Sequence, residues 1–445
     1  MTTAIKDFAE KYSRSGVSRL HMPGHKGAPM HGLEPLDLTE IKGADFLYDP
    51  DGIILSSELK TSAAYGSAMT AYSAEGSSLS IKSALSIIRQ YLGKNITVAA
   101  PRNCHRAFLN GCALLDVDVK WIYPSEPSDL LCRCSVTAEA VEHTLKNGGV
   151  DAVYITSPDY LGSVADIAGI SEVCRKHGAF LICDNAHGAY LKFLTESLHP
   201  LDLGADIVCD SAHKTLPVYT GGAYLHISKK APKEFCALAK PAMALFGSTS
   251  PSYLIMESLD ICAGLLGTSL PGDIRKCCEK VGKIKELMKS RGIPDLASEP
   301  MKITAAAEKI GYGGEELAEL MRQARIECEY ADPAAVVLMF SPYNTQTDFD
   351  RVTDFFSRLP IKAQLKYSEP PLPTEAKQYM SIRRAMLSPS EQISSQQAEG
   401  RICASCAMSC QPSVAVVMAG EMITSETVRL LERYGIDRVD VIRQE

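Results

Sequence analysis

Short apolar runs alternate with amphipathic, helix-like stretches through the middle third of the chain. The apolar runs are rich in β-branched residues and span 96–100, 152–155, 180–183, 207–209 and 223–227, so we expect five buried strands there. Helical periodicity falls between them, for example at 138–146 and at 170–177, where Gly178 marks the end of the helix. Strand and helix in alternation predict an α/β domain with a mostly parallel sheet, in which ligands bind at the carboxyl ends of the strands.

The pattern changes after about residue 270, where longer and more charged helical segments begin. Helices are predicted at 274–291, 315–325, 349–358 and 425–434, with a strand at 336–340. The segment 367–374 holds three prolines and is expected to be a connector. We therefore predict an N-terminal arm over residues 1–60, a large α/β domain over 61–270 and a smaller α+β domain over 271–445.

Composition narrows the class of protein. Apolar residues make up 46% of the chain and charged residues 22%, as in ordinary globular proteins. The formal net charge of −7 disfavours nonspecific nucleic-acid binding, which depends on basic surface. No apolar run reaches the roughly 18–20 residues of a membrane span, and the N-terminal stretch lacks the apolar core of a signal peptide. We expect a cytoplasmic protein that binds neither nucleic acid nor membrane.

The 15 cysteines are an odd number, and without an export signal they predict free thiols in a reducing compartment. Cys403, Cys406 and Cys410 have a spacing compatible with zinc or an iron–sulfur centre. A closed site usually has four ligands, and no fourth Cys or His follows in the tail, so we predict no metal. The pairs Cys132/Cys134 and Cys277/Cys278 are interpreted as incidental.

A candidate phosphate site precedes an amphipathic helix that Gly93 ends. In Glu75-Gly76-Ser77-Ser78, the glycine allows close approach of an anion to the backbone, and the serines add hydroxyl groups to the unpaired N–H groups of a helix start. The alternative interpretation is an ordinary serine N-cap.

Two strand ends carry groups that suit pyridoxal phosphate. This cofactor needs a lysine that holds its aldehyde as a Schiff base and a carboxylate that keeps its ring nitrogen protonated. Asp184 follows the run 180–183, and Lys214 lies 30 positions later in Ser211-Ala212-His213-Lys214. Ser211 and His213 are predicted to reach the phosphate from the same turn. There are two competing interpretations: Asp184 is a buried residue that caps a turn, or Asp184 and His187 bind a metal.

At the end of the run 96–100, His105 is a candidate to lie flat on the cofactor ring. With it, the motifs occur in a specific order and resemble those of the ornithine/lysine/arginine decarboxylase family of fold-type-I pyridoxal-phosphate enzymes. The likeness is to the shorter bacterial members that lack an N-terminal wing domain. The matching segments are 20–27 (LHMPGHKG), 37–41 (DLTEI), 102–105 (RNCH), 184–189 (DNAHGA), 211–216 (SAHKTL), 248–253 (STSPSY) and, more weakly, 398–402 (AEGRI). The family implies an aspartate-aminotransferase-like sheet domain and a smaller C-terminal α+β domain.

The resemblance also assigns roles. It implies that Lys214 forms the Schiff base, Asp184 pairs with the ring nitrogen and His105 stacks on the ring. His187 would border the ring. We predict that His187 or Lys214 returns a proton to the product. The implied phosphate ligands are Gly76, Ser77, Ser78, Ser211 and His213, with Thr249 and Ser250 supplied across the interface of a homodimer or a higher even oligomer.

The implied reaction is decarboxylation of arginine, lysine or ornithine to an amine of the polyamine type. The chain departs from the family at several positions: Ala212 replaces a commoner Thr, Glu75 opens a phosphate loop that is usually Asn-Gly-Thr-Ser, and Asp159 stands where Thr is frequent. The segments 264–276 and 411–413 also differ. None of these changes removes a predicted catalytic atom, but they leave the choice of substrate open.

Recognition of the substrate's side chain stays open as well. Asp45, Glu399 and Glu421 are candidates for its distal positive group, and Arg383 is a candidate for a carboxylate. The alternatives are an aminotransferase or another amino-acid lyase of the same fold, a non-catalytic regulatory homologue, and a metal-dependent hydrolase.

Overall fold

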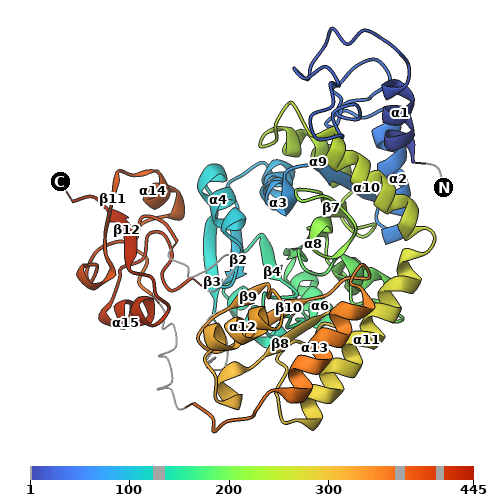
Figure 1. Cartoon of the computed structure of the whole chain (residues 1–445). Coiled ribbons are helices and arrows are strands. Elements are labelled where there is room, and N and C mark those ends of the chain that lie inside the picture. The colour runs from blue at the N-terminus through green and yellow to red at the C-terminus, as the bar shows by residue number, and fades with distance from the viewer. Residues whose placement is uncertain (1–2, 124–135, 366–375, 407–414, 445) are drawn as a thin grey trace. The chain divides into compact units, whose positions relative to one another are not determined.

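The computed structural model describes residues 3–123, 136–365, 376–406 and 415–444 (Figure 1). Outside the described residues lie the predicted connector at 367–374 and three of the cysteines, namely Cys132, Cys134 and Cys410. Contacts divide the chain into two compact units. The first comprises Met1–Ile96, Asp151–Ile155 and Ile167–Ile274, and the second comprises Thr97–Val150, Thr156–Asp166 and Arg275–Glu445. The domain boundaries near residues 60 and 270 stay predictions.

Seven strands form one sheet in the order β1-β7-β6-β5-β4-β2-β3. Their bounds are β1 Met69–Ser73, β2 Thr97–Pro101, β3 Asp118–Ile122, β4 Ala152–Thr156, β5 Phe180–Asp184, β6 Ile207–Asp210 and β7 Ala223–Ile227. β5 is parallel to β6 and β2 is parallel to β3, whereas β7 is antiparallel to β6 and to β1. The predicted α/β class with a mostly parallel sheet is confirmed, and all five predicted strands form.

The first unit holds five of these strands and most of the candidate site. Every residue of β4, β6 and β7 is buried, as expected for strands with helices on the sheet faces. Helix α3 (Gly76–Leu92) contacts β6 and β7 and buries Ile81, Ala84, Leu85 and Ile88 of its amphipathic pattern, whereas Tyr91 is exposed. The other helices are α1 Ala4–Ser13, α2 Ile53–Tyr65, α6 Ile167–His177, η1 Ala189–Phe193, α7 Pro200–Leu203, α8 Ala212–Thr215, α9 Glu234–Ala244 and α10 Tyr253–Leu266.

The second unit contains two small antiparallel sheets. One has the order β8-β10-β9 and the other pairs β11 with β12. The bounds are β8 Lys302–Ala305, β9 Tyr330–Ala331, β10 Val336–Met339, β11 Ser390–Ser394 and β12 Arg438–Ile442. The helices are α4 Arg106–Leu115, α5 Ala138–Lys146, η2 Ala307–Ile310, α12 Gly314–Gln323, α13 Gln346–Arg358, α14 Ile382–Leu387, η3 Ser395–Gln397 and α15 Ser425–Arg433.

Helix starts differ most from the predictions. Helix α13 begins three residues before the predicted position because Thr345 and Asp348 form a capping box at its N-terminus. Helix α11 spans Leu270–Ser290 and also begins earlier than the predicted residue 274. No single helix in the described ranges is long and apolar enough to cross a membrane; α10 and α11, which are bent by 83° at the break between them, pass that test only as a pair.

Candidate active site

Lys214 lies one turn beyond the carboxyl end of β6. The strand ends at Asp210, and the short helix α8 then carries the lysine, whose backbone N–H donates to Ser211 O at 3.1 Å. Its Nζ lies 3.0 Å from Nε2 of His187, which follows β5. The parallel pairing of β5 and β6 brings these two side chains together, as the sequence predicted for groups at adjacent strand ends.

Asp184 is the last residue of β5 and is only 1% exposed. Its Oδ2 accepts a hydrogen bond from the Tyr154 hydroxyl at 2.7 Å, and its Oδ1 accepts from Ala186 N at 3.2 Å. Tyr154 lies on β4, so a strand and a turn both fix the orientation of the carboxylate. Tyr154 is not among the residues predicted from the sequence; a tyrosine hydroxyl in the middle of a fully buried strand was the available signal.

The turn after Asp184 depends on a glycine. Gly188 N donates to Asn185 O at 2.8 Å, which closes the turn that carries His187. A Cβ atom on Gly188 would lie 2.0 Å from Asn185 Oδ1 and 2.7 Å from Leu191 Cδ1. No side chain fits in that space, so glycine is required at this position.

The candidate phosphate loop begins α3. Gly76 has a φ of +69°, a conformation that favours glycine, and its N–H donates to Gly221 O at 2.7 Å. Glu75 stands at the N-cap but makes no capping hydrogen bond there; its carboxylate instead accepts from Ser248 N at 2.5 Å. The Ser211 hydroxyl donates to the Ser77 hydroxyl at 2.8 Å, so the serine after β6 meets the serine at the helix start.

These residues fit pyridoxal phosphate. The start of a 17-residue helix presents backbone N–H groups and a partial positive charge, and the hydroxyls of Ser77 and Ser211 lie beside it, which is a donor set suited to a phosphate. Lys214 and Asp184 supply the amine and the carboxylate that the aldehyde and the ring nitrogen require. Beside Lys214, the buried Thr215 Oγ1 has no hydrogen-bond partner among the described residues, which leaves it available to a ligand.

His213 has one ring nitrogen engaged. Its Nδ1–H donates to Gly222 O at 3.0 Å, and the backbone N–H of His213 donates to the same carbonyl. Burial lowers the pKa of His213. The nearby charge of Lys214 lowers this pKa further, whereas the hydrogen bond to Gly222 raises it. The ring is therefore neutral near pH 7, and Nε2 is its second, unprotonated nitrogen.

Ser78 belongs to the first turn of α3, and the remaining predicted cofactor ligands lie farther along the chain. Thr249 and Ser250 are exposed, and Ser250 N donates to the Ser248 hydroxyl at 3.1 Å. His105 belongs to the second unit, where it caps α4 by accepting from Ala107 N at 3.1 Å. The roles of His105, Thr249 and Ser250 stay predictions.

Three candidates for substrate recognition have other partners. Glu421 accepts from both terminal nitrogens of Arg102, at 2.6 and 3.0 Å, and this ion pair is fully buried. Arg383 donates to Ala113 O and Leu114 O at the end of α4, at 2.9 and 3.0 Å. The carboxylate of Asp45 accepts backbone hydrogen bonds within its own loop, from residues 46, 51, 52, 54 and 55.

Glu421 is thus a structural partner of Arg102, and Asp45 organises a loop. Glu399 is exposed. The interpretation of Glu421 as a group that awaits the substrate is wrong, because its two oxygens are already taken by a buried guanidinium.

Within the described ranges, one group of side chains has the proximity of a metal site, namely His199, Asp210 and His226. This group was not predicted from the sequence, because its three members come from separate elements; the position of Asp210 directly before Ser211 was the available signal. Cys403 is buried and Cys406 Sγ lies 3.7 Å from Met418 Sδ.

The sheet, with Lys214 and Asp184 at neighbouring strand ends, is that of the fold-type-I class of pyridoxal-phosphate enzymes. A family model described as Orn/Lys/Arg decarboxylase, major domain, matches residues 5–303, more than half of the chain. The chain belongs to the ornithine/lysine/arginine decarboxylase family, as the motifs predicted, and it is an amino-acid decarboxylase of the pyridoxal-phosphate-dependent kind.

Relatives and solved structures agree with this assignment. The uncharacterized protein YaaO of Bacillus subtilis is 26% identical, over 97% of this chain and 94% of YaaO. The arginine decarboxylase of Bacillus subtilis is 24% identical, over 94% of this chain and 91% of the relative. The lysine decarboxylase LdcF of Francisella novicida has a TM-score of 0.81 at 18% identity, over 99% of this chain and 81% of that chain, and this likeness confirms the fold.

Proposed function

We propose that this chain removes the α-carboxylate of a basic amino acid, namely arginine, lysine or ornithine, and releases carbon dioxide and the corresponding amine. The observation that carries the proposal is the contact between Lys214 Nζ and His187 Nε2 beside the buried carboxylate of Asp184. A lysine, a proton-carrying imidazole and a carboxylate in one place are the groups that this reaction needs from the protein.

Lys214 and Asp184 are the proposed attachment points of pyridoxal phosphate. Lys214 would bind the aldehyde carbon through Nζ, and Asp184 would accept a hydrogen bond from the protonated ring nitrogen while Tyr154 and Ala186 keep its orientation. When bound, the cofactor supplies an electron sink for the pair of electrons that the departing carbon dioxide leaves behind.

The phosphate is proposed to bind at the start of α3. The proposed donors are the backbone N–H groups of Ser77 and Ser78 and the hydroxyl of Ser77, which Ser211 orients through its own hydrogen bond, while Gly76 lets the phosphate approach the backbone. His213 is the weaker member of this set, because a neutral Nε2 has no proton to donate. It would assist only where phosphate binding raises its pKa enough to protonate it.

His187 and Lys214 are proposed to move the proton. The amine nitrogen and the imidazole nitrogen lie within hydrogen-bond distance, so a proton passes between them without an intervening group. After carbon dioxide leaves, either group would deliver a proton to the α-carbon, and the other would restore it. His105 is proposed to stack on the ring.

An assembly of two copies is proposed because Thr249 and Ser250 are expected to reach the partner's phosphate. Their exposure supports this, as do the exposed apolar side chains of the N-terminal arm, among them Leu20 at 93%. A cytoplasmic location is proposed from the free thiol state of every described cysteine. The amine product would then serve polyamine biosynthesis.

Arginine is the substrate to test first, because a relative named arginine decarboxylase aligns with nearly all of this chain. Purified protein would be loaded with pyridoxal phosphate and supplied in turn with arginine, lysine, ornithine and smaller amino acids, and both carbon dioxide and amine would be measured. We expect one basic amino acid to be used at least about tenfold better than the others by kcat/KM.

Matched variants complete the experiment. Lys214→Ala should lose the absorption band of lysine-bound cofactor and essentially all carbon dioxide release, whereas Lys229→Ala, which removes an exposed lysine after β7, should behave as wild type. Keto-acid formation without carbon dioxide would favour an aminotransferase. Protein that ignores added pyridoxal phosphate would favour a regulatory homologue.

A further inference from the structure

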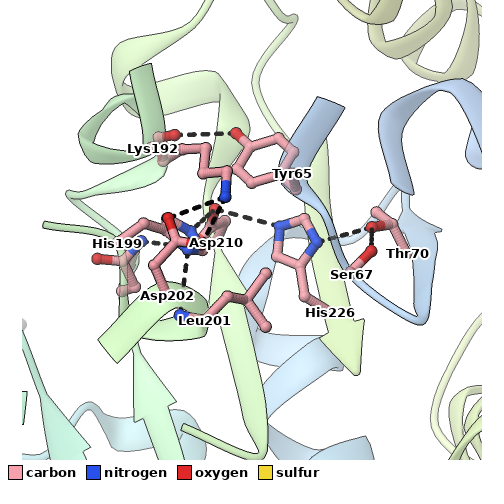
Figure 2. Close-up of polar contacts among 12 residues, drawn as sticks. Tyr65, Ser67, Thr70, Lys192, His199, Leu201, Asp202, Asp210 and His226 are labelled. Carbon is pink, nitrogen blue, oxygen red and sulfur yellow. Dashed lines mark hydrogen bonds and ion pairs between the residues drawn. The ribbon is translucent and has the colours of Figure 1, made fainter. Parts of the chain in front are cut away.

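A buried polar network adjoins the candidate site through Asp210 and Asn185, and Figure 2 shows Asp210 with His199 and His226. Asp210 is fully buried, and its Oδ2 lies 3.0 Å from His199 Nε2 and 3.2 Å from His226 Nε2. Its Oδ1 accepts from Asn185 Nδ2 at 2.7 Å. The Tyr65 ring packs against the His226 ring with 4.4 Å between centroids. One carboxylate therefore accepts three hydrogen bonds in a site without solvent.

The proton positions in this network follow from its partners. His199 Nδ1 accepts from Leu201 N, so the proton of the neutral ring is on Nε2, which donates to Asp210. Burial lowers the pKa of His226, and its neutral ring donates through Nε2 to Asp210 and accepts through Nδ1 from the Thr70 hydroxyl at 2.8 Å. Burial opposes ionisation of Asp210, yet the two histidines hold its pKa well below the usual range.

This arrangement argues against a metal ion. The three ligand atoms lie within 4.8 Å of one another, the proximity of a two-histidine, one-carboxylate site. A metal binds the unprotonated nitrogen of an imidazole, but both Nε2 atoms carry protons that point at Asp210. The cluster is a hydrogen-bonded carboxylate, and its function depends on the chain segments that its hydrogen bonds fix in place.

Asp210 fixes the two segments that form the candidate site. Asp210 is covalently next to Ser211, and α8 with Lys214 follows. Asn185, which Asp210 binds through a side chain, is covalently next to Asp184, and Asn185 N also donates to Cys209 O at 2.9 Å. A shift of Asp210 would therefore move both attachment points of the cofactor.

We propose that Asp210, held by His199 and His226, is a positioning residue that sets the separation between Asp184 and Lys214. Asp210 touches neither substrate nor cofactor and acts through Asn185 and Ser211. The inference rests on the proposed function, because the separation matters only if both groups bind pyridoxal phosphate. The isosteric change to asparagine removes the charge and leaves an amide to satisfy three donors.

The test compares Asp210→Asn, Asn185→Ala and the double variant with wild type, in the cofactor-loaded protein. We expect Asp210→Asn to weaken pyridoxal-phosphate binding and to lower kcat by at least about tenfold each, with KM changed less than about threefold, since the loss lies in alignment of the reacting groups. The absorption spectrum of the bound cofactor should shift as well. The double variant should lose little more than either single variant, because both changes break one link.

Asp202→Asn is the matched control. Asp202 lies in the same close-up but pairs with Lys192 and Ser197, so its loss should leave cofactor affinity, spectrum and kcat unchanged (Figure 2). If Asp210→Asn does not fold, Thr70→Val removes only the hydroxyl that His226 accepts from, and it should shift the same spectrum in the same direction by a smaller amount.

Each outcome of these experiments either supports or overturns the proposed role of Asp210. A folded Asp210→Asn variant with wild-type affinity, spectrum and kcat overturns the inference, as does full additivity with Asn185→Ala. If purified wild-type protein contains stoichiometric zinc, and if the His199→Gln variant contains none, the three side chains form a metal site and the proposed network is wrong. If wild-type protein takes up no pyridoxal phosphate, the proposed function fails first. The tautomer of His199, read by nitrogen NMR without cofactor, then still tests the hydrogen-bond network.

Discussion

The Nζ atom of Lys214 and the Nε2 atom of His187 are 3.0 Å apart, which is a hydrogen-bond distance. The two residues lie 27 positions apart in the chain, on turns that follow adjacent parallel strands. Because a neutral amine and an imidazole each donate and accept, the pair exchanges a proton without moving its heavy atoms. The contact underlies the proton transfer proposed for both residues, whereas cofactor attachment is proposed for Lys214 alone.

Replacement of His187 by glutamine should separate these two roles. Glutamine keeps a hydrogen-bonding group near Lys214 but does not carry a proton to the product. We expect the variant to bind pyridoxal phosphate with a near-normal spectrum while kcat falls by about 10²–10⁴-fold. Stopped assays of carbon dioxide release, with cofactor content measured on the same sample, check this. A kcat within about threefold of wild type contradicts the role of His187.

Gly188 makes a steric prediction for the same turn. In Gly188→Ala, the new Cβ would meet Asn185 Oδ1 at 2.0 Å, so the turn that carries His187 must open. We expect the free energy of unfolding to fall by about 1–3 kcal/mol and the affinity for pyridoxal phosphate to weaken. Urea unfolding and a cofactor titration measure the two effects.

Gly282→Ala is the control for that experiment. Gly282 lies inside α11 and a Cβ there would meet nothing within 4 Å, so alanine should stabilise the helix by about 0.5–1 kcal/mol. If both alanine variants behave alike, the steric account of Gly188 is wrong.

Much of the candidate site was accessible from the sequence because its groups stand at strand ends. The runs 180–183 and 207–209 predicted β5 and β6, and parallel strands bring their carboxyl ends together, so Asp184 and Lys214 were expected at the same edge of the sheet. Helix α5 has the predicted bounds because a threonine cap and an apolar periodicity define it locally.

Contacts that depend on tertiary packing were not accessible. Asp210 meets His199 and His226 from three separate elements, and no periodicity relates such positions. Arg102 and Glu421 are 319 positions apart, and from the sequence Glu421 was one of three acidic candidates, with no ranking among them, for the substrate's positive group. An acidic residue that recognises a ligand and one that pairs with a buried arginine look the same until the fold brings the arginine to it.

The Arg102–Glu421 pair makes its own prediction. Glu421 also accepts from Met418 N at 2.8 Å, so the ion pair ties two parts of the second unit together. Arg102→Met leaves a buried carboxylate without its cation, and we expect the free energy of unfolding to fall by about 3–5 kcal/mol. The double variant Arg102→Met/Glu421→Met should recover much of that loss, because no charge is left buried. Urea unfolding of the three proteins tests this, and equal stability of the single variant and wild type contradicts it.

Glu257 on α10 makes the final prediction, which concerns pH. The side chain is 5% exposed, and its Oε1 has no hydrogen-bond partner in the part of the chain that the structure describes. Burial raises its pKa to about 8, and the charges of Asp37 and Asp260 add to this while Lys6 opposes it. The folded protein thus keeps a proton that the unfolded chain releases near pH 4.5, so this group's contribution to stability is complete at low pH and is lost as pH rises towards 8.

Glu257→Gln keeps the shape of the protonated acid and removes its ionisation. The variant should be more stable than wild type by about 1–4 kcal/mol at pH 8, and the difference should shrink steadily towards pH 5. Urea unfolding at pH 5, 6.5 and 8 measures the trend. Glu279→Gln, which alters an exposed glutamate on α11, should follow wild type at all three values. Parallel pH profiles of Glu257→Gln and wild type would mean that Glu257 ionises normally in the folded protein, and the buried, protonated state argued for it would be wrong.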